Sequence, residues 1–149
     1  MSGLVNDIGS ESGIIGAGST INYEEGTYTP TVSVATGTPA FTVRFGHFVI
    51  TGNHAMVRAE WRFDGTRSSG QIYTSLPVLP QTLSGSTYGS YVGVYGRENN
   101  STGFGLTGFW DSSRNQIGIK RVHDNSNVSS DNQYQYTVFM HYITDLNAV

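Results

Sequence analysis

His54-Ala-Met-Val-Arg-Ala-Glu-Trp-Arg-Phe63 is the stretch that decides the fold class of this chain. Its apolar and intervening side chains alternate strictly, and a period of two is typical of a β-strand with one face in a core. The apolar set is Ala55, Val57, Ala59, Trp61 and Phe63, and the other set is Met56, Arg58, Glu60 and Arg62. We therefore predict a long strand that buries one face and keeps the other polar.

Residues 134–143 have the same period but carry apolar side chains on both faces. One face holds Tyr134, Tyr136, Val138, Met140 and Tyr142, and the other holds Gln135, Thr137, Phe139, His141 and Ile143. A strand that is apolar on both sides is typical of a sheet centre or of a surface covered by another subunit. Both readings stay open from the sequence.

Shorter stretches rich in β-branched and aromatic residues surround these two, and clusters of Gly, Ser, Asn and Asp separate them. They are residues 31–34, 41–45, 48–50, 71–74, 91–95, 103–109 and 116–122. About nine short strands with regular turn signals are typical of a sandwich or jelly roll. We predict an all-β, antiparallel β-sandwich or jelly-roll-like domain.

The amino-acid composition agrees with this class and excludes others. Charged residues are 13% of the 149, against about 25% in average proteins, and Lys120 is the only lysine. Strong helix formers are too few for a helical bundle or coiled coil, and 12% aromatic residues are too many for a disordered chain. Because cysteine is absent, stability must come from packing or assembly rather than from disulfides.

Net charge and targeting signals exclude further classes. A net charge of −3 gives no electrostatic footprint for nucleic acid. The N-terminus lacks a basic region followed by an apolar run, so no secretory signal is predicted. No window approaches the ~18 apolar residues of a membrane span. We expect a protein made in the cytoplasm that neither binds nucleic acid nor inserts into a membrane.

Residues 1–22 differ from the rest and are predicted to form an extended N-terminal arm ahead of a β-sandwich domain at residues 23–149. Through Gly26 the chain has four acidic residues and no Lys or Arg, whereas the remainder sums to +1. Isolated apolar residues in the arm are spaced for neither a helix nor a long strand. The expected anchoring side chains are Leu4, Val5, Ile8, Ile14 and Ile15. An unstructured leader is the alternative interpretation.

Motifs for cofactors and catalysis are weak. Gly103-Phe-Gly-Leu-Thr-Gly108 has dinucleotide-binding spacing, but Phe-Trp and a turn follow it where that motif requires a helix. We interpret these glycines as thin positions where another backbone or ring lies close. The segment 85–89 places threonine where a nucleophile elbow requires serine.

Acid–base and metal chemistry are equally poorly supported. The four histidines lack metal-ligand spacing, and Glu60 with Asp64 is not a convincing glycosidase pair. The segment 124–131 lacks the glycine and glutamate of a helical calcium loop. We expect no enzyme activity, no cofactor and no metal site.

Tyrosine is abundant, and its amphipathic ring suits contact with another surface. A sandwich core with tyrosines at its rim would absorb part of this surplus. We predict an interface, with protein or with carbohydrate, and its candidate aromatic residues are Tyr91, Tyr95, Tyr134, Tyr136 and Tyr142.

Three segments resemble small bacteriophage virion proteins and the C-terminal receptor-binding domains of phage tail fibres. The first is Tyr23-Glu24-Glu25-Gly26-Thr27-Tyr28-Thr29-Pro30, the second is Gly46-His-Phe-Val-Ile-Thr-Gly52-Asn53, and the third is Ile72-Tyr-Thr-Ser-Leu-Pro77. The family commonly has Lys-Ile before Gly-Asn, where this chain has Ile50-Thr51. We expect Gly26 to permit a turn, Glu24 or Glu25 to accept hydrogen bonds from backbone N–H groups or an Arg, and Pro30 to set the entry to the first strand.

The resemblance implies a β-rich homotrimer in the virion, assembled in the bacterial host cytoplasm. The expected function is capsid decoration: a cement protein that binds the shell through its arm and stabilises it, with the major capsid protein or other virion proteins as partners. The alternative is a tail-fibre or tail-tip protein that recognises host surface glycans. We favour decoration because no repetitive stalk precedes the domain.

Overall fold

The computed structural model describes residues 23–64, 69–81, 92–99, 103–128 and 134–144. Within these ranges the chain forms β-strands and no helix, so no helix there could span a membrane. The strands are β1 (Tyr23–Tyr28), β2 (Val32–Thr36), β3 (Phe41–Thr51), β4 (His54–Phe63), β5 (Ser69–Ser75), β6 (Val92–Glu98), β7 (Gly105–Asp111), β8 (Gln116–Arg121) and β9 (Gln135–Ile143).

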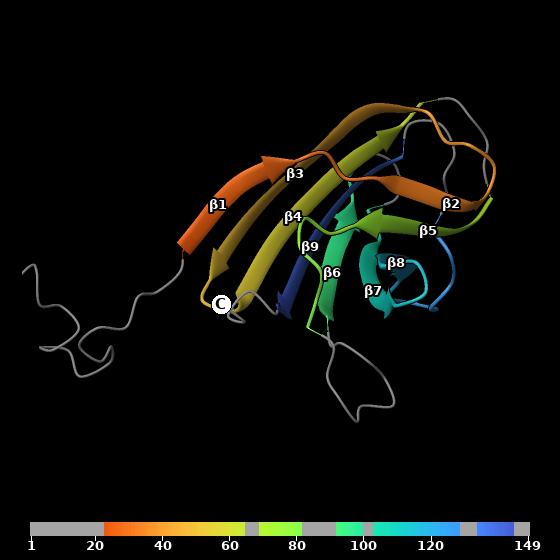
Figure 1. Cartoon of the computed structure of the whole chain (residues 1–149). Helices are drawn as coiled ribbons and strands as arrows, with labels where there is room; N and C mark the ends of the chain where they lie inside the picture. The colour runs from red at the N-terminus through yellow and green to blue at the C-terminus, as the bar shows by residue number, and fades with distance from the viewer. Residues whose placement is uncertain (1–22, 65–68, 82–91, 100–102, 129–133, 145–149) are drawn as a thin grey trace, which may run out of the picture.

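All strand pairs are antiparallel, and the strands form one sheet in the order β1-β3-β4-β9-β6-β7-β8-β5-β2. The sheet curls into a half-barrel, so that β2 and β5 lie across from β3 and β4 (Figure 1). The predicted all-β antiparallel class is confirmed. The described strands form one continuous sheet, because hydrogen bonding continues from β9 through β6, β7 and β8 to β5.

Residues 134–143, for which the sequence left a sheet centre or a subunit-covered surface open, contain strand β9 in the interior of the sheet. β9 lies between β4 and β6, with Val138 opposite both Ala59 and Gly96. Gly96 has no room for a side chain, because a Cβ there would lie 2.3 Å from the carbonyl oxygen of Thr137. The strand order places β9 in the interior of the sheet, but Phe139 and Ile143 on its other face remain exposed.

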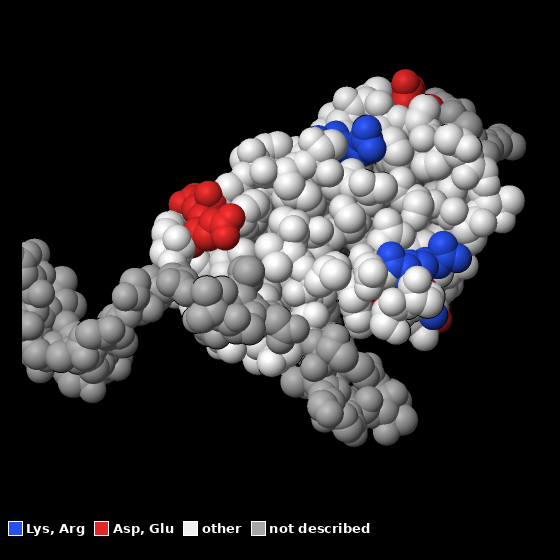
Figure 2. Space-filling model, in the orientation of Figure 1, with Lys and Arg blue, Asp and Glu red and all other residues white. Residues whose placement is uncertain are grey.

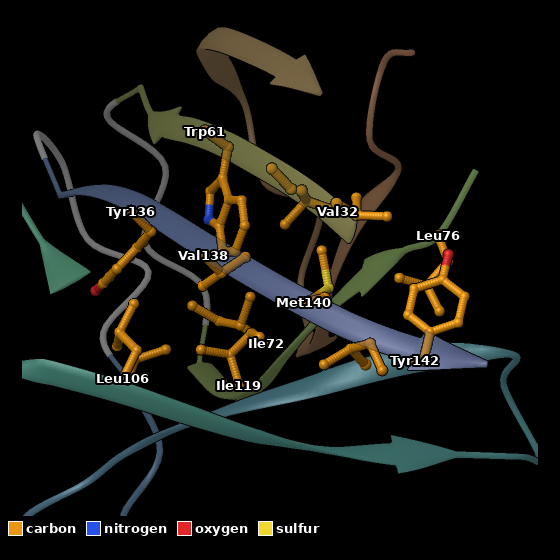
Figure 3. Close-up of a cluster of buried hydrophobic side chains, with 14 of the residues drawn as sticks. Val32, Trp61, Ile72, Leu76, Leu106, Ile119, Tyr136, Val138, Met140 and Tyr142 are labelled. Atoms are coloured by element: carbon orange, nitrogen blue, oxygen red, sulfur yellow. The ribbon is translucent and has the colours of Figure 1, made fainter. Parts of the chain in front are cut away.

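The core fills the concave side of the curled sheet. Alternate side chains of β4 and β9 point into it and meet side chains from β5, β7 and β8 (Figure 3). Trp61 and Tyr136 are fully buried with ring centroids 5.8 Å apart. The buried cluster comprises Val32, Ile50, Ala55, Val57, Ala59, Trp61, Phe63, Ile72, Leu76, Leu106, Ile117, Ile119, Val128, Tyr136, Val138, Met140 and Tyr142. The period of two in β4 and β9 therefore produced the core as predicted.

β3 differs from the prediction, because it joins the two expected strands at 41–45 and 48–50 into one. It turns tightly into β4, with Thr51 paired to His54 across Gly52 and Asn53. Gly52 has a φ of 62°, a conformation that suits glycine in a two-residue hairpin. The Gly-Asn part of the family-like motif is therefore the β3–β4 turn.

Candidate functional site

The first family-like motif forms strand β1, where a turn at Gly26 was expected. Gly26 pairs with Phe48, and a Cβ at Gly26 would lie 2.9 Å from the Phe48 ring. Tyr28 pairs with Gly46, and a Cβ at Gly46 would lie 2.2 Å from the Tyr28 ring. Each glycine thus leaves room for the aromatic ring of its cross-strand partner. This reciprocal packing fixes β1 onto β3, so the glycine serves ring packing and not a turn.

Glu25 accepts hydrogen bonds, but its partners are the side chains of Tyr23 and His47 and not the backbone N–H groups or the arginine that the sequence predicted. The Tyr23 hydroxyl donates to its Oε2 at 2.6 Å, and His47 Nε2 lies 3.0 Å from its Oε1. The Tyr23 hydrogen bond, followed by that from His47, lowers the pKa of Glu25 below its ordinary value. Glu24 is exposed in the same strand, and Pro30 is buried just after it. Figure 2 shows acidic atoms gathered at this β1 end, on a face that is otherwise mostly uncharged.

The convex side of the sheet carries the feature with most potential for binding. The side chains of β3, β4, β9 and β6 that point away from the core are named the outer face. Large apolar side chains that a core would normally bury are exposed on it: Phe45, Met56, Tyr95, Phe139 and Ile143. Met56 is 57% exposed and Tyr95 is 61% exposed. A contiguous exposed apolar surface of this kind indicates an interaction site.

The cross-strand register brings these side chains together in rows. His47, Arg58, Phe139 and Tyr95 are direct neighbours along one row, one from each strand. The Tyr95 and Phe139 rings are stacked with centroids 5.3 Å apart and planes 13° from parallel. Such a pair presents a flat, rigid aromatic surface to solvent.

A shallow hollow of about 450 Å³ lies within the outer face. This volume falls in the range of small-ligand pockets, but its lining is mainly apolar. The lining residues are His47, Val49, Met56, Val57, Arg58, Tyr95, Phe139, Met140 and His141. The hollow therefore suits apolar side chains or a ring with a few polar groups at the margin.

Polar groups at the margin of the hollow are held in place by their neighbours. Arg58 Nη2 donates to Glu60 Oε2 at 2.8 Å, and Gln135 Nε2 donates to Glu60 Oε1 at 2.6 Å. The His54 and His141 rings stack with centroids 5.9 Å apart. In the described part of the chain, no three His, Asp or Glu side chains are grouped as metal ligands. The hollow and the polar groups at its margin are therefore suited to binding a partner or a ligand.

The candidate aromatic residues lie in different environments in the structure. Tyr95 lies on the outer face, while Tyr136 and Tyr142 are buried at inward positions of β9, at 0% and 2% exposure. Tyr134 is half-buried and stacks on Tyr136. Those two core tyrosines cannot present a surface to a partner, because β9 directs them to its concave side. Tyr91 and the arm residues Leu4, Val5, Ile8, Ile14 and Ile15 lie outside the described residues.

The sequence did not single out Met56, Phe139, His47 and Arg58 as one site. Period-two alternation shows that Met56 and Arg58 share a face, but the proximity of Phe139 follows from the β4–β9 register, in which Phe139 lies opposite Arg58. The only available sign was the apolar character of the second face of residues 134–143.

Comparison with protein-family models, with curated proteins and with solved structures gives no significant match. The likeness to phage virion proteins therefore depends on the three sequence motifs.

Proposed function

We propose that this chain is a structural protein of a bacteriophage virion, a decoration or cement protein that binds the capsid as a homotrimer. The observation that carries the proposal is the exposed apolar outer face, together with the virion-like motifs that build β1 and its pairing with β3. In this proposal the two flanks of the curled sheet correspond to the layers of a jelly-roll-like sandwich.

The outer face supports assembly energetically. Each of its large apolar side chains contributes roughly 1 to 3 kcal/mol if a contact takes it fully out of water, so Met56, Tyr95 and Phe139 alone offer several kcal/mol. Their location on three neighbouring strands makes one continuous patch. Subunits that pack through this patch on the particle would gain stability by mutual burial.

The arm supplies the proposed anchor to the shell. Residues 1–22 carry Asp7 and Glu11 and no Lys or Arg, and their apolar side chains Leu4, Val5, Ile8, Ile14 and Ile15 are available to bury in a partner. Such a segment gains affinity only when it is ordered on a partner surface. The proposed partner is the major capsid protein or another virion protein.

Counting copies per particle tests the proposal directly. Hundreds of copies, in threefold clusters in images of the particle, are expected for shell decoration, whereas a few dozen or fewer would refute it in favour of a tail appendage. Removing residues 2–20 should abolish attachment to particles, and a Met56→Glu substitution should break the threefold clusters. Val122→Glu is a matched control, because Val122 is 61% exposed but lies beyond the end of β8.

A second candidate function is recognition of host surface glycans by a tail protein. The exposed Tyr95 ring on Phe139, with Arg58 and His141 at the margin of the hollow, favours it because sugar rings stack on aromatic faces while polar groups orient them. Binding of the isolated protein to a glycan array, lost in Tyr95→Ala and kept in Tyr23→Ala, would support it. Tyr23 is the matched control because it is 62% exposed at the sheet edge.

A further inference from the structure

Charged side chains on the convex side of the sheet are sorted by strand. Arg58 is neutralised by Glu60, whose Oε2 lies 2.8 Å from its Nη2. Asp111 is matched by Arg114, whose Nε lies 3.6 Å from its Oδ2. With histidine taken as neutral, the remaining charged groups at convex positions of the described strands are Glu25 on β1, Arg62 on β4, Arg97 on β6 and Lys120 on β8. We name the β1–β3 side the acidic flank and the β6–β8 side the basic flank.

Glu25 remains a negative acceptor although it has partners on its own molecule. The Tyr23 hydroxyl donates to its Oε2 and His47 Nε2 lies 3.0 Å from its Oε1, and these contacts keep its pKa low. A carboxylate has about four lone-pair positions, so each oxygen can accept a further donor. The Glu25 side chain is 50% exposed, and the exposed Glu24 beside it adds a second carboxylate at this edge. The acidic flank can therefore receive a cation from another molecule.

The curvature of the sheet decides how two copies can meet. The exposed side chains of Met56 and Phe139 lie on β4 and β9, between the two flanks, on the convex side of the curled sheet (Figure 1). Two convex faces packed centre to centre would leave their flanks apart, with the charges still in water. In a ring of copies, each convex face contacts the next through opposite flanks, which is a heterologous interface. Only the ring brings an acidic and a basic flank together at every contact.

We propose that copies of this chain associate head to tail, with the acidic flank of one copy against the basic flank of the next. Glu25 of one copy faces Arg97 of its neighbour, and the contact covers the apolar side chains between the flanks. Because both complementary charges belong to one chain, the occupant that this face selects is a second copy. Closure of the ring by three copies rests on the homotrimer of the proposed function, whereas the head-to-tail contact rests on the two flanks.

Cross-linking between single-cysteine chains tests the contact, because the natural sequence has no cysteine. Thr27→Cys marks the acidic flank and Thr107→Cys marks the basic flank, since the two residues stand in one row of the sheet but five strand spacings apart. That separation is about 24 Å along the sheet, so the two sites report on different surfaces. The two full-length chains, one of them isotope-labelled, are mixed, treated with a short bismaleimide and analysed by mass spectrometry.

Head-to-tail association predicts that the Thr27–Thr107 product exceeds each same-site product at least about tenfold, because the contact raises the local concentration of one pair alone. Ser112→Cys in place of Thr107→Cys is the control. Ser112 is exposed in the β7–β8 turn, about 17 Å along β7 from Thr107, and its product with Thr27→Cys should stay at background. Equal yields of mixed and same-site products would overturn the proposal. A dominant same-site product would also overturn it, because it is the mark of an isologous contact.

The mass of the natural chain in solution, measured by light scattering, separates this inference from the homotrimer. A trimer whose cross-links are not head to tail refutes the contact and keeps the homotrimer. Head-to-tail cross-links in an assembly of another size keep the contact and refute the homotrimer. A chain that is monomeric at every concentration refutes both.

Charge reversal tests the two flanks independently of cross-linking. Arg97→Glu places a carboxylate against Glu25 and should weaken association at least about tenfold. The double variant Glu25→Arg, Arg97→Glu restores opposite charges and should regain the natural association, which a misfolded chain could not do. Arg62→Glu is the matched control, because Arg62 lies on β4 between the flanks and the change should leave association nearly unaltered. Equal losses in Arg97→Glu and Arg62→Glu, or no recovery in the double variant, would overturn the proposal.

Discussion

The packing of Tyr28 over Gly46 leads to a sharp prediction for the variant Gly46→Ala. A Cβ at this position would lie 2.2 Å from Tyr28 Cε1, 2.5 Å from Cδ1 and 2.7 Å from Cζ. The ring would have to retreat by about 1.2 Å to reach the 3.4 Å of ordinary contact. Tyr28 packs against the core and its hydroxyl donates to the Ser75 carbonyl oxygen at 3.4 Å, so the displacement affects both interactions.

The expected magnitude follows from these contacts. Tyr28 is half-buried, so displacing it loses about 1 to 1.5 kcal/mol, half the value of a fully buried large side chain. Loss of a hydroxyl hydrogen bond adds about 1 kcal/mol. Alanine regains about 0.5 to 1 kcal/mol because it suits a strand better than glycine. The net expectation is a decrease of about 1.5 kcal/mol in the free energy of unfolding.

Urea unfolding measures this change as a lower midpoint with an unchanged slope. Gly93→Ala is the matched control, since a Cβ at Gly93 meets nothing closer than the His141 carbonyl oxygen at 3.6 Å. In a Tyr28→Ala background, Gly46→Ala should raise the free energy of unfolding by about 0.5 to 1 kcal/mol, because the clash is absent and only the preference of a strand for alanine remains. The reasoning is refuted if Gly46→Ala and Gly93→Ala are equally stable, or if the Gly46→Ala cost persists without the Tyr28 ring.

Three further predictions concern titration and the core. Burial raises the pKa of Tyr142 above its ordinary value of 10.0, so the stabilisation from its neutral hydroxyl is complete below pH 10.0 and is lost as the pH rises further. Tyr142→Phe should therefore flatten the alkaline decline in melting temperature. At neutral pH the same variant should lose about 1 kcal/mol, because the hydrogen bond to the Val78 carbonyl oxygen is absent. The pKa of Glu25 is lowered, so its contribution to stability is present above its ordinary value of 4.5 and is lost as the pH falls below that value. In an acid titration, Glu25→Gln should lose less stability below pH 4.5 than the natural chain. An unchanged stability profile would contradict the role of the Glu25 hydrogen bonds. Trp61 is fully buried, and its Nε1 has no hydrogen-bond partner in the described part of the chain. Trp61→Phe should therefore lose only packing, which lowers the free energy of unfolding in chemical denaturation by about 1 to 3 kcal/mol. A larger loss would indicate a polar interaction of the indole.

Much of the fold could be predicted because alternation is a local property. The side chains of β4 and β9 alternate over ten and nine residues, and this pattern alone identified two strands and the residues they bury. Glycine-rich turn segments separated most of the other strands, but β3 continues across Gly46. Its glycine is a packing position, and a sequence cannot distinguish this from a turn until the partner ring is known.

The candidate site was much less predictable, because it depends on which strands are neighbours. Tyr136 and Tyr95 are both tyrosines in strands, yet one is in the core and the other is on the outer face. The stacked contact of Tyr95 with Phe139 joins strands more than 40 residues apart in the chain and exists because β6 pairs with β9.

By itself, the sequence determined that this protein is all-β, which residues share a strand face, and that the first 26 residues are acidic whereas the remainder is nearly neutral. These properties depend on side-chain period and composition, which are local. Only the tertiary structure decided that the strands form one curled sheet, that β1 is fixed by reciprocal glycine–aromatic pairs, and that Met56, Tyr95 and Phe139 meet around a hollow. Those properties depend on long-range hydrogen bonding between strands, whose order and register the local alternation leaves open.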